Sequence, residues 1–322
     1  MRIALAGGSG FIGEALRRHW GRAGVSVVRL VRRPPQGPDE VEWDPLGGRM
    51  DLAPLAGCEA LVNLAGENIA GGRWTPARKA LLRESRVRTT HLLAAALSGG
   101  SWRPRVWVNA SAVGFYGDAG ERVLDEAAPQ GVGFLASVCG AWEAETVAAA
   151  AAGVRVVRLR LGVVLDPAGG ALAKLVPVFR AGLGGPLGDG RMWMSWIALD
   201  ELCRVVDTVI ADERLVGPVN AVSPDPVRNA DFAAALGGVL RRPAIVRTPA
   251  WAVRALFGEM GGETLLASQR AVPGCWRRRD TGSSPATLPG RCGGSLDRRR
   301  GLPSRGGLGC FPCRNREVSG AQ

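Results

Sequence analysis

A glycine-rich turn near the start of the chain has the residue types and spacing that could hold a phosphate. It reads GGSGFIG over residues 7–13. Gly7 allows a tight turn, Gly10 lets backbone N–H groups approach a pyrophosphate, and Gly13 permits close packing of a helix on a strand. Positions 7, 10 and 13 give a three-residue spacing, whereas 8, 10 and 13 give G-x-G-x-x-G, and spacing alone does not choose between them. The pattern predicts a dinucleotide cradle. The alternative is a turn without a ligand.

The residues after the second expected strand indicate which dinucleotide is bound. Sites for NAD usually place an acid there, and sites for NADP place an arginine near the 2′-phosphate. This chain reads RLVRRP over residues 29–34, with no acid, and Arg32 lies nineteen residues after Gly13. A guanidinium can bind a phosphate through two hydrogen bonds. We therefore expect NADP(H) rather than NAD. A solvated charge pair at a strand end is the alternative.

A second small-residue turn, NLAG over residues 63–66, follows a buried strand. Turns at the carboxyl ends of parallel strands line the crevice where doubly wound sheets bind ligands. Glu67 follows directly and could act as a carboxylate base in that crevice. Its alternative role is a helix-start charge or a salt bridge.

Alternating strand and helix patterns must position these residues. The expected strands are 2–6, 25–31, 58–66, 106–111 and 154–165, and the expected helices are 14–23, 76–97 and 135–152. Strand–turn–helix–strand is the context that the glycine pattern requires. The order predicts an α/β fold with a doubly wound parallel sheet. His19 and His91 fall on expected helices away from the crevice, so a histidine mechanism is not expected.

Composition excludes several classes of protein. The 322 residues are 46% hydrophobic, enough for a sizeable core, and no stretch reads as a membrane helix. No cleavable signal precedes the first strand, so we expect a cytoplasmic protein. The formal charge of +12 lies mostly in the tail: residues 274–322 carry ten Arg against three acids. We therefore expect no nucleic-acid partner for the main body, and we assign no metal site.

Six further segments, taken together, resemble a known superfamily over residues 1–273. They are listed in chain order: NLAGE (63–67), SAVGFYGD (111–118), RLGVVL (160–165), FRAGLGGPLGDGRMWMSWI (179–197), GPVNAVSPDPVRNADFA (217–233) and RRPAIVRTPAWAVRALFGEMGGETLLASQRAVP (241–273). With the glycine turn, they are similar to the extended short-chain dehydrogenase/reductases, in an atypical subfamily described as NAD-dependent epimerase/dehydratase-like or nucleoside-diphosphate-sugar epimerase. The last segment, 241–273, resembles the small C-terminal domain of unknown function of that subfamily. This resemblance implies a Rossmann-like NADP(H)-binding domain with a smaller C-terminal α/β substrate lobe.

The resemblance also implies roles for single residues. The residues implied to line the pyrophosphate are Gly7, Ser9, Gly10, Phe11 and Ile12, with Gly13 behind them. Arg32 would meet the adenosine phosphate, Leu64, Ala65 and Gly66 would flank the cofactor, and Val163 would lie near the nicotinamide. Arg86 could reach a cofactor phosphate, with a solvated helix face as an equal alternative.

The catalytic pair of the superfamily is missing. Those enzymes use a Tyr with a Lys four residues later, because a nearby cation makes the phenol a usable base. Here the single tyrosine, Tyr116, has Gly120 at that position. Aligning Glu143 with the glutamate of the superfamily helix puts Leu135 and Cys139 at the Tyr and Lys positions.

The remaining catalytic candidates are Ser111, Tyr116 and Glu67. Ser111 stands at a strand end, where the catalytic Ser of the superfamily would lie. Tyr116 could face the substrate or be a packed aromatic with a satisfied hydroxyl. Cys139 is a replacement acid or, more often for such a residue, a small buried hydrophobe.

The domain organisation follows from these patterns. We expect an NADP-binding domain over 1–165, to which parts of 198–225 return, and a substrate lobe over 166–273. The partner is an unidentified small-molecule substrate, and a homodimer remains open. The alternative function is a catalytically silent NADP(H)-binding sensor or interaction protein.

The segment 274–322 loses all periodicity, and we expect a disordered tail. Read in another frame, WRRRDTGS (276–283) yields LEAAGYRF, the continuation typical of the subfamily, so a shifted reading frame is our hypothesis for this segment. Zinc binding by its four cysteines has weak support, because only Cys310 and Cys313 have ligand spacing.

Overall fold

An eight-stranded sheet forms the centre of the computed structural model, which describes residues 1–99 and 102–274. Its strands, in spatial order, are β12 (Gly217–Ala221), β8 (Val156–Leu161), β6 (Val106–Ala112), β5 (Ala60–Asn63), β1 (Arg2–Ala6), β2 (Ser26–Val31), β3 (Glu40–Asp44) and β4 (Arg49–Met50). All neighbours are parallel except the β3–β4 pair. The chain runs outward from β1 through β2 and β3, then returns to β5 on the other side of β1. This reversal puts the topological switch point between β1 and β5.

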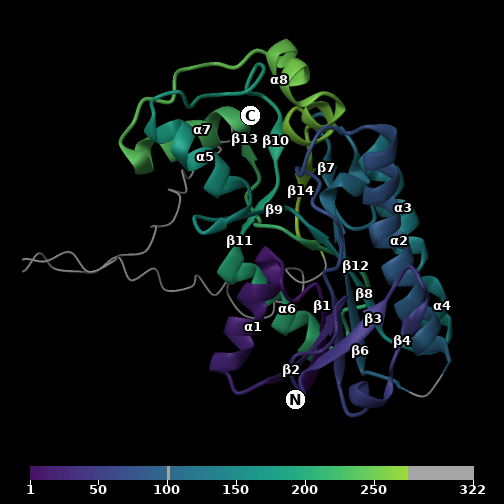
Figure 1. Cartoon of the computed structure of the whole chain (residues 1–322). Coiled ribbons are helices and arrows are strands. Elements are labelled where there is room, and N and C mark those ends of the chain that lie inside the picture. Colours follow the sequence, from purple (N-terminus) through teal and green to yellow (C-terminus); the bar gives the residue numbers. More distant parts are fainter. Residues whose placement is uncertain (100–101, 275–322) are drawn as a thin grey trace, which may run out of the picture.

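Helices cover both faces of this sheet (Figure 1). On one face α1 (Phe11–Arg22) packs beside α6 (Leu199–Ala211). On the other face α2 (Pro76–Ser98) packs beside α3 (Phe134–Ala144) and α4 (Val147–Ala151). The strands alternate accordingly: Ile3 and Leu5 belong to the core under α1, whereas Ala4 and Ala6 belong to the core under α2. The doubly wound Rossmann-like prediction is confirmed.

A smaller lobe sits at the carboxyl edge of the sheet, in the upper part of Figure 1. Its helices are α5 (Gly170–Arg180), α7 (Asn229–Leu240) and α8 (Ala250–Phe257), followed by a π-helical turn, η3 (Gly261–Leu265). Its short strands are β9 (Val163–Asp166), β10 (Trp193–Met194), β11 (Trp196–Ala198) and β13 (Val227–Arg228). A separate core including Leu165, Phe179, Phe232 and Leu236 holds this lobe together.

The remaining short elements connect the two parts. They are η1 (Ala53–Leu55), η2 (Val113–Tyr116), β7 (Val123–Leu124) and β14 (Arg270–Ala271). Strand β14 pairs in parallel with β7, so the end of the described chain returns to the main body. There the Glu126 carboxylate accepts hydrogen bonds from Gly274 N (3.0 Å) and Asn220 N (3.0 Å).

Three predicted elements are wrong in detail. The strand expected over 154–165 is two strands, because Gly162 leaves the main sheet: a Cβ there would lie 2.8 Å from Ser195 O. Strand β9 then pairs with β11 rather than with β6. The helix expected over 135–152 is likewise two helices, which separate after Ala144. The strand expected over 58–66 is confined to Ala60–Asn63, and the 76–97 helix is confirmed as α2.

Among the described residues, no helix has the length and apolarity needed to cross a membrane. The prediction of a disordered, frame-shifted tail falls on residues that lie, from 275 onward, outside the described part of the chain.

Candidate functional site

The glycine turn between β1 and α1 packs against the turn after β5. Gly7 has φ +80°, and a Cβ on it would lie 2.7 Å from Leu64 C. A Cβ on Gly13 would overlap Gly7 O. A Cβ on Gly8 would meet side-chain atoms alone, at 3.2 Å or more. The sequence left two glycine spacings open, one that begins at position 7 and one that begins at position 8. The backbone needs glycine at position 7 and not at position 8, so the spacing is 7, 10 and 13.

The N-terminus of α1 opens toward solvent at this turn. Gly10 is the N-cap residue, has no side chain, and donates its N–H to Gly7 O at 3.1 Å. Ser9 and Gly10 are exposed, so a ligand can approach the first N–H groups of the helix. Ile12 is half-buried against the core, and the Phe11 ring lies under Gly169, where a Cβ would overlap it. The small lobe thus reaches the cradle at Phe11.

Arg32 stands at the carboxyl end of β2 with an exposed side chain. Its neighbour Arg33 donates two hydrogen bonds to the Glu40 carboxylate, at 2.7 and 2.8 Å, and Arg29 pairs with the same carboxylate. These Arg33 bonds, with a backbone bond from Gln36, hold the pKa of Glu40 at about 2. Within the described chain Arg32 forms no hydrogen bond or ion pair, so its guanidinium is available to a phosphate.

The turn after β5 is held from below by buried polar groups. Asn63 accepts a hydrogen bond from Ala65 N (3.1 Å) and donates to Asn109 (2.7 Å). Arg86 is buried and donates to Glu67 O (3.0 Å) and Leu82 O (2.9 Å). The solvated-helix alternative for Arg86 is therefore wrong. Leu64 and Ala65 are half-buried, and Gly66 is exposed.

Glu67 directly follows this turn. Its carboxylate accepts a hydrogen bond from Arg78 Nη2 at 3.0 Å, and its side chain is 33% exposed. This contact is the salt bridge that the sequence left as an alternative, and it leaves the carboxylate in reach of solvent.

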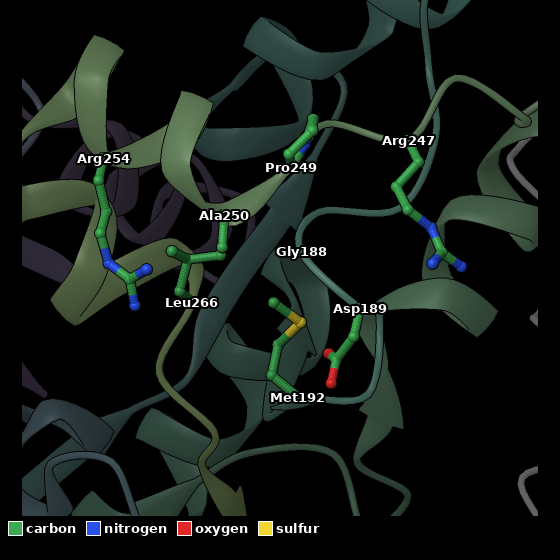
Figure 2. A pocket seen from close by; sticks show the side chains of 8 residues that line it. All are labelled: Gly188, Asp189, Met192, Arg247, Pro249, Ala250, Arg254 and Leu266. Atoms are coloured by element: carbon green, nitrogen blue, oxygen red, sulfur yellow. The ribbon is translucent and has the colours of Figure 1, made fainter.

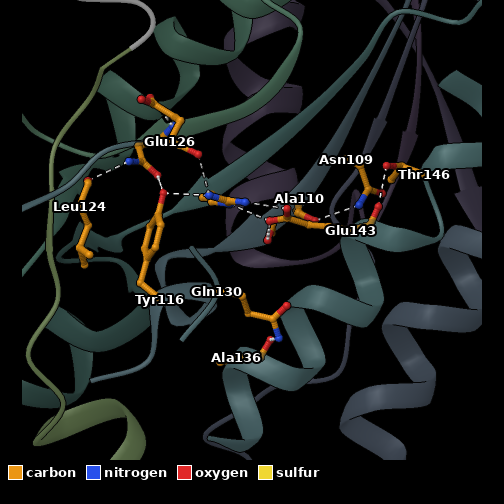
Figure 3. A network of polar contacts seen from close by, with 12 residues as sticks. Asn109, Ala110, Tyr116, Leu124, Glu126, Gln130, Ala136, Glu143 and Thr146 are labelled. Carbon is orange, nitrogen blue, oxygen red and sulfur yellow. Dashed lines mark hydrogen bonds and ion pairs between the residues drawn. The ribbon is translucent and has the colours of Figure 1, made fainter. Parts of the chain in front are cut away.

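Ser111 and Tyr116 belong to a buried polar network instead. Figure 3 shows Tyr116 and Glu143 of this network. Ser111 is 1% exposed and donates to Glu143 Oε1 at 2.6 Å. Arg160, the register partner of Ser111 on β8, donates from Nε and Nη2 to the two Glu143 oxygens at 2.8 and 2.9 Å. The guanidinium also lies 3.6 Å from the Phe115 ring centroid.

The Tyr116 hydroxyl is saturated with partners in the same network. It donates to Asn220 Oδ1 (2.7 Å) or Asp125 O (3.0 Å), and it accepts from Arg160 Nη1 (3.0 Å). Burial raises the pKa of Tyr116 above its usual range, although Arg160 opposes this. These contacts favour the packed-aromatic alternative, because a base needs its deprotonated form near neutral pH.

The α3 residues that the superfamily alignment selects, Leu135 and Cys139, pack against η2. Leu135 and Cys139 both face Gly114, at 3.4 and 3.9 Å from a Cβ placed there. Burial, followed by the charge of Glu143, raises the pKa of Cys139 to about 12. A thiol with this pKa is a poor acid or base at neutral pH, which favours its role as a buried hydrophobe. Val163, in β9, is half-buried beside Trp196.

Sequence reasoning missed the charged residues of this network. Arg160 interrupts the apolar strand VVRLRLGVV, and Glu143 ends the apolar helical stretch FLASVCGAWE. A charged residue in an apolar run is costly to bury unless it is paired. The position of these two residues in apolar runs could therefore have indicated that each has a buried partner. The pairing itself joins residues from different elements and has no local pattern.

Two family models match the chain. The model of the NAD dependent epimerase/dehydratase family matches residues 3–221, and a domain of unknown function, DUF1731, matches residues 248–277. The predicted superfamily resemblance, including its C-terminal domain of unknown function, is confirmed.

Curated and solved relatives cover most of the chain. Epimerase family protein Mb2239 of Mycobacterium bovis is 46% identical over 276 residues, which are 86% of this chain and 91% of that protein. The structure of human epimerase family protein SDR39U1 with NADPH is 33% identical, with a TM-score of 0.78 over 89% of this chain and 95% of that chain. A nucleoside-diphosphate sugar epimerase from Corynebacterium glutamicum is 37% identical, with a TM-score of 0.71 over 87% of this chain and 54% of that chain.

Proposed function

We propose, from the premise that this chain belongs to the NAD-dependent epimerase/dehydratase family, that it binds NADP(H) and catalyses an oxidoreductase or epimerase-like reaction by an atypical mechanism. The observation that carries the proposal is the glycine cradle together with Arg32, which has no hydrogen-bond or ion-pair partner among the described residues. The relative from human, SDR39U1, was solved with NADPH, which supports the phosphorylated cofactor.

In this proposal each edge of the crevice holds one part of the cofactor. The pyrophosphate lies on the N-terminus of α1, in a turn whose close backbone packing needs glycine at positions 7 and 13. Arg32 binds the adenosine 2′-phosphate, and the 64–66 turn flanks the cofactor with Arg86 supporting it from below. Val163 lies near the nicotinamide. When bound, NADP(H) supplies a hydride donor or acceptor, and the protein supplies orientation.

Of the three catalytic candidates, Ser111, Tyr116 and Glu67, we assign proton transfer to Glu67. The hydroxyls of Ser111 and Tyr116 are buried and already bonded to Glu143, Arg160 and Asn220. Among the described residues the Glu67 carboxylate has one side-chain partner, Arg78, and the Glu67 side chain is one-third exposed. A partly exposed carboxylate can accept a proton from a substrate hydroxyl.

A silent NADP(H) sensor is the second candidate. The missing Tyr–Lys pair and the buried state of Ser111 and Tyr116 favour it. It needs the cofactor cradle but no acid or base in the crevice.

Consumption of NADPH against a library of carbonyl compounds separates the two candidates. We expect turnover that Gly13→Ala abolishes, because its Cβ would overlap Gly7 O. Gly21→Ala is the matched control in the same helix, since a Cβ there meets nothing within 4 Å. Glu67→Gln should lower kcat with NADPH affinity unchanged. NADPH binding without consumption of any compound would instead establish the sensor.

A further inference from the structure

Large apolar side chains of the small lobe face solvent. Ile245, Trp251 and Leu256 are 80%, 73% and 66% exposed. Other large apolar residues of the same lobe are also exposed: Val178, Leu183, Val239, Val246 and Phe257. Single exposed apolar residues are normal on a protein surface, whereas several in one region indicate a surface that binds a partner.

Helix α8 buries little of its apolar surface. Its sequence, AWAVRALF, has one charged residue, Arg254, and Val253 is its one buried residue. A helix that is apolar nearly all round normally lies inside a core or against another apolar phase. Helix α8 instead leaves Trp251, Leu256 and Phe257 exposed.

The segment from α7 to α8 connects these side chains along one edge of the lobe, at the top of the view in Figure 1. Val246 N donates to Gly184 O at 3.2 Å, and Arg242 Nε donates to Arg180 O at 3.1 Å. The segment therefore lies against the end of α5. We call the exposed side chains of residues 178–183 and 239–257 the outer edge of the small lobe.

The charges of the outer edge are positive. Its exposed arginines are Arg180, Arg241, Arg242, Arg247 and Arg254, and within the described chain none of them pairs with a carboxylate. The sequence from 232 to 258 contains no acid. Arg247 and Arg254 extend on opposite sides of the start of α8 in Figure 2, so the charge is spread along the edge. Asp189 is the one acid that lines the pocket between them.

Apolar groups mixed with unpaired arginines distinguish the classes of partner. A second copy of the chain in a symmetric dimer would bring the same positive edge against itself, and like charges repel. A nucleic acid would attract the arginines, but it offers little to aliphatic side chains such as Ile245 and Leu256. An anionic lipid surface matches both, because its phosphates attract arginine and its acyl boundary accepts apolar side chains, tryptophan above all.

We propose that the outer edge of the small lobe binds peripherally to a membrane surface rich in anionic lipid. Ile245, Trp251 and Leu256 enter the boundary between headgroups and acyl chains, and the arginines contact the lipid phosphates. Contact of this kind needs no membrane-spanning helix. It is independent of the proposed function, because it uses neither the glycine cradle nor Glu67.

Sedimentation of the full chain with vesicles tests the role of charge. The vesicles are phosphatidylcholine alone and an equal mixture of phosphatidylcholine and phosphatidylglycerol. We expect the mixed vesicles to bind at least tenfold more tightly, since each arginine near an anionic surface strengthens binding by roughly fivefold. The double variant of Arg241→Gln and Arg242→Gln should weaken this binding by about tenfold or more. The matched control is the double variant of Arg83→Gln and Arg88→Gln on α2, which should bind as the wild type does.

A second pair of variants tests the role of the apolar side chains. Ile245→Ser combined with Leu256→Ser should weaken binding to the mixed vesicles by about tenfold or more. Val132→Ser combined with Val147→Ser, two exposed valines of the main body, is the control and should leave binding unchanged. The basic segment 274–322 could itself attract anionic lipid, but every variant keeps it, so the comparison isolates the outer edge.

Quenching of Trp251 by brominated lipid locates the contact directly. The chain has ten tryptophans, so the signal of Trp251 is the difference between the wild type and Trp251→Phe. We expect mixed vesicles with brominated acyl chains to quench this difference signal, because Trp251 lies at the acyl boundary.

Several results would overturn the proposal. They are no binding of the mixed vesicles, equal binding of the two compositions, full binding by either double variant of the outer edge, or an unquenched Trp251. A dimer in solution that Ile245→Ser with Leu256→Ser converts to a monomer would assign the edge to a second copy of the chain instead.

Discussion

The buried pair of Arg160 and Glu143 organises the residues around the missing catalytic tyrosine. Glu143 accepts from Ser111 and from two nitrogens of Arg160, and Arg160 reaches on to the Tyr116 hydroxyl. These groups occupy the end of β6, where the superfamily resemblance places a catalytic serine. The donors and acceptors of these side chains are paired with one another. The network therefore holds β6, β8 and α3 together and leaves no free acid or base.

The ionisation of Tyr116 tests this structural role directly, because the chain has one tyrosine. Burial raises its pKa, so the absorbance change of tyrosinate should appear above pH 10, the usual value for the phenol. The stability that the neutral phenol contributes is fully present below about pH 10 and is lost as pH rises through the higher folded-state pKa. The protein in denaturant is the control and should titrate near 10. A folded-state midpoint at or below 10 would contradict the role.

The helices of the small lobe and main body meet at the start of α3. Gly133 gives this helix no side-chain cap, and Glu263 from η3 takes that place: its carboxylate accepts from Phe134 N and Leu135 N, both at 2.7 Å. Nearby, Lys79 pairs with Glu259 at 2.7 Å. Two carboxylates in different environments therefore connect the C-terminal segment to α2 and α3.

Removing these carboxylates should have unequal effects on stability. Glu263→Ala leaves two helix N–H groups without an acceptor and should lower the free energy of unfolding by about 1–2 kcal/mol. Glu259→Ala, the matched control, breaks an exposed pair and should cost less than about 1 kcal/mol. Urea denaturation of the two variants measures both. Equal losses would show that Glu263 does not cap α3.

The sequence predicted the elements around the glycine turn better than the elements where the chain enters the small lobe. The glycines at 7 and 13 are local signals because one turn needs them at fixed spacing, and Arg32 is a local signal because it directly follows the second strand. The exit of the chain from the main sheet at Gly162 depends on Ser195, far along the sequence. Long-range contacts of this kind, like the Arg160–Glu143 pair, leave no periodic pattern to read.

At the scale of the whole molecule, the last described residues bind back to the main body. Gly274 donates its N–H to Glu126, and Asn220 donates its side-chain amide to Val272 O at 2.9 Å. The family match continues to residue 277, close to the point where the sequence changes character. In the preceding segment Trp251 and Leu256 of α8 are 73% and 66% exposed.

A frame-restored protein should therefore be more stable than this chain. Its residues after Gly274 would be replaced by the alternative translation that begins LEAAGYRF, whose apolar residues can bury further surface. We expect a higher melting temperature for the restored protein, measured at equal protein concentration. An equal melting temperature would refute the prediction, and resequencing that confirms the present frame would remove its basis.

The measurement that tests the central claim most directly is a calorimetric titration of NADPH and NADH into the wild-type protein and Arg32→Ala. The account predicts that the wild-type protein binds NADPH more tightly than NADH. It predicts that Arg32→Ala loses on the order of tenfold or more in NADPH affinity, with NADH affinity nearly unchanged. Arg22→Ala, at the far end of α1, is the control and should bind as the wild type does. Equal affinity of the wild type for the two cofactors, or no binding of either, would contradict the account.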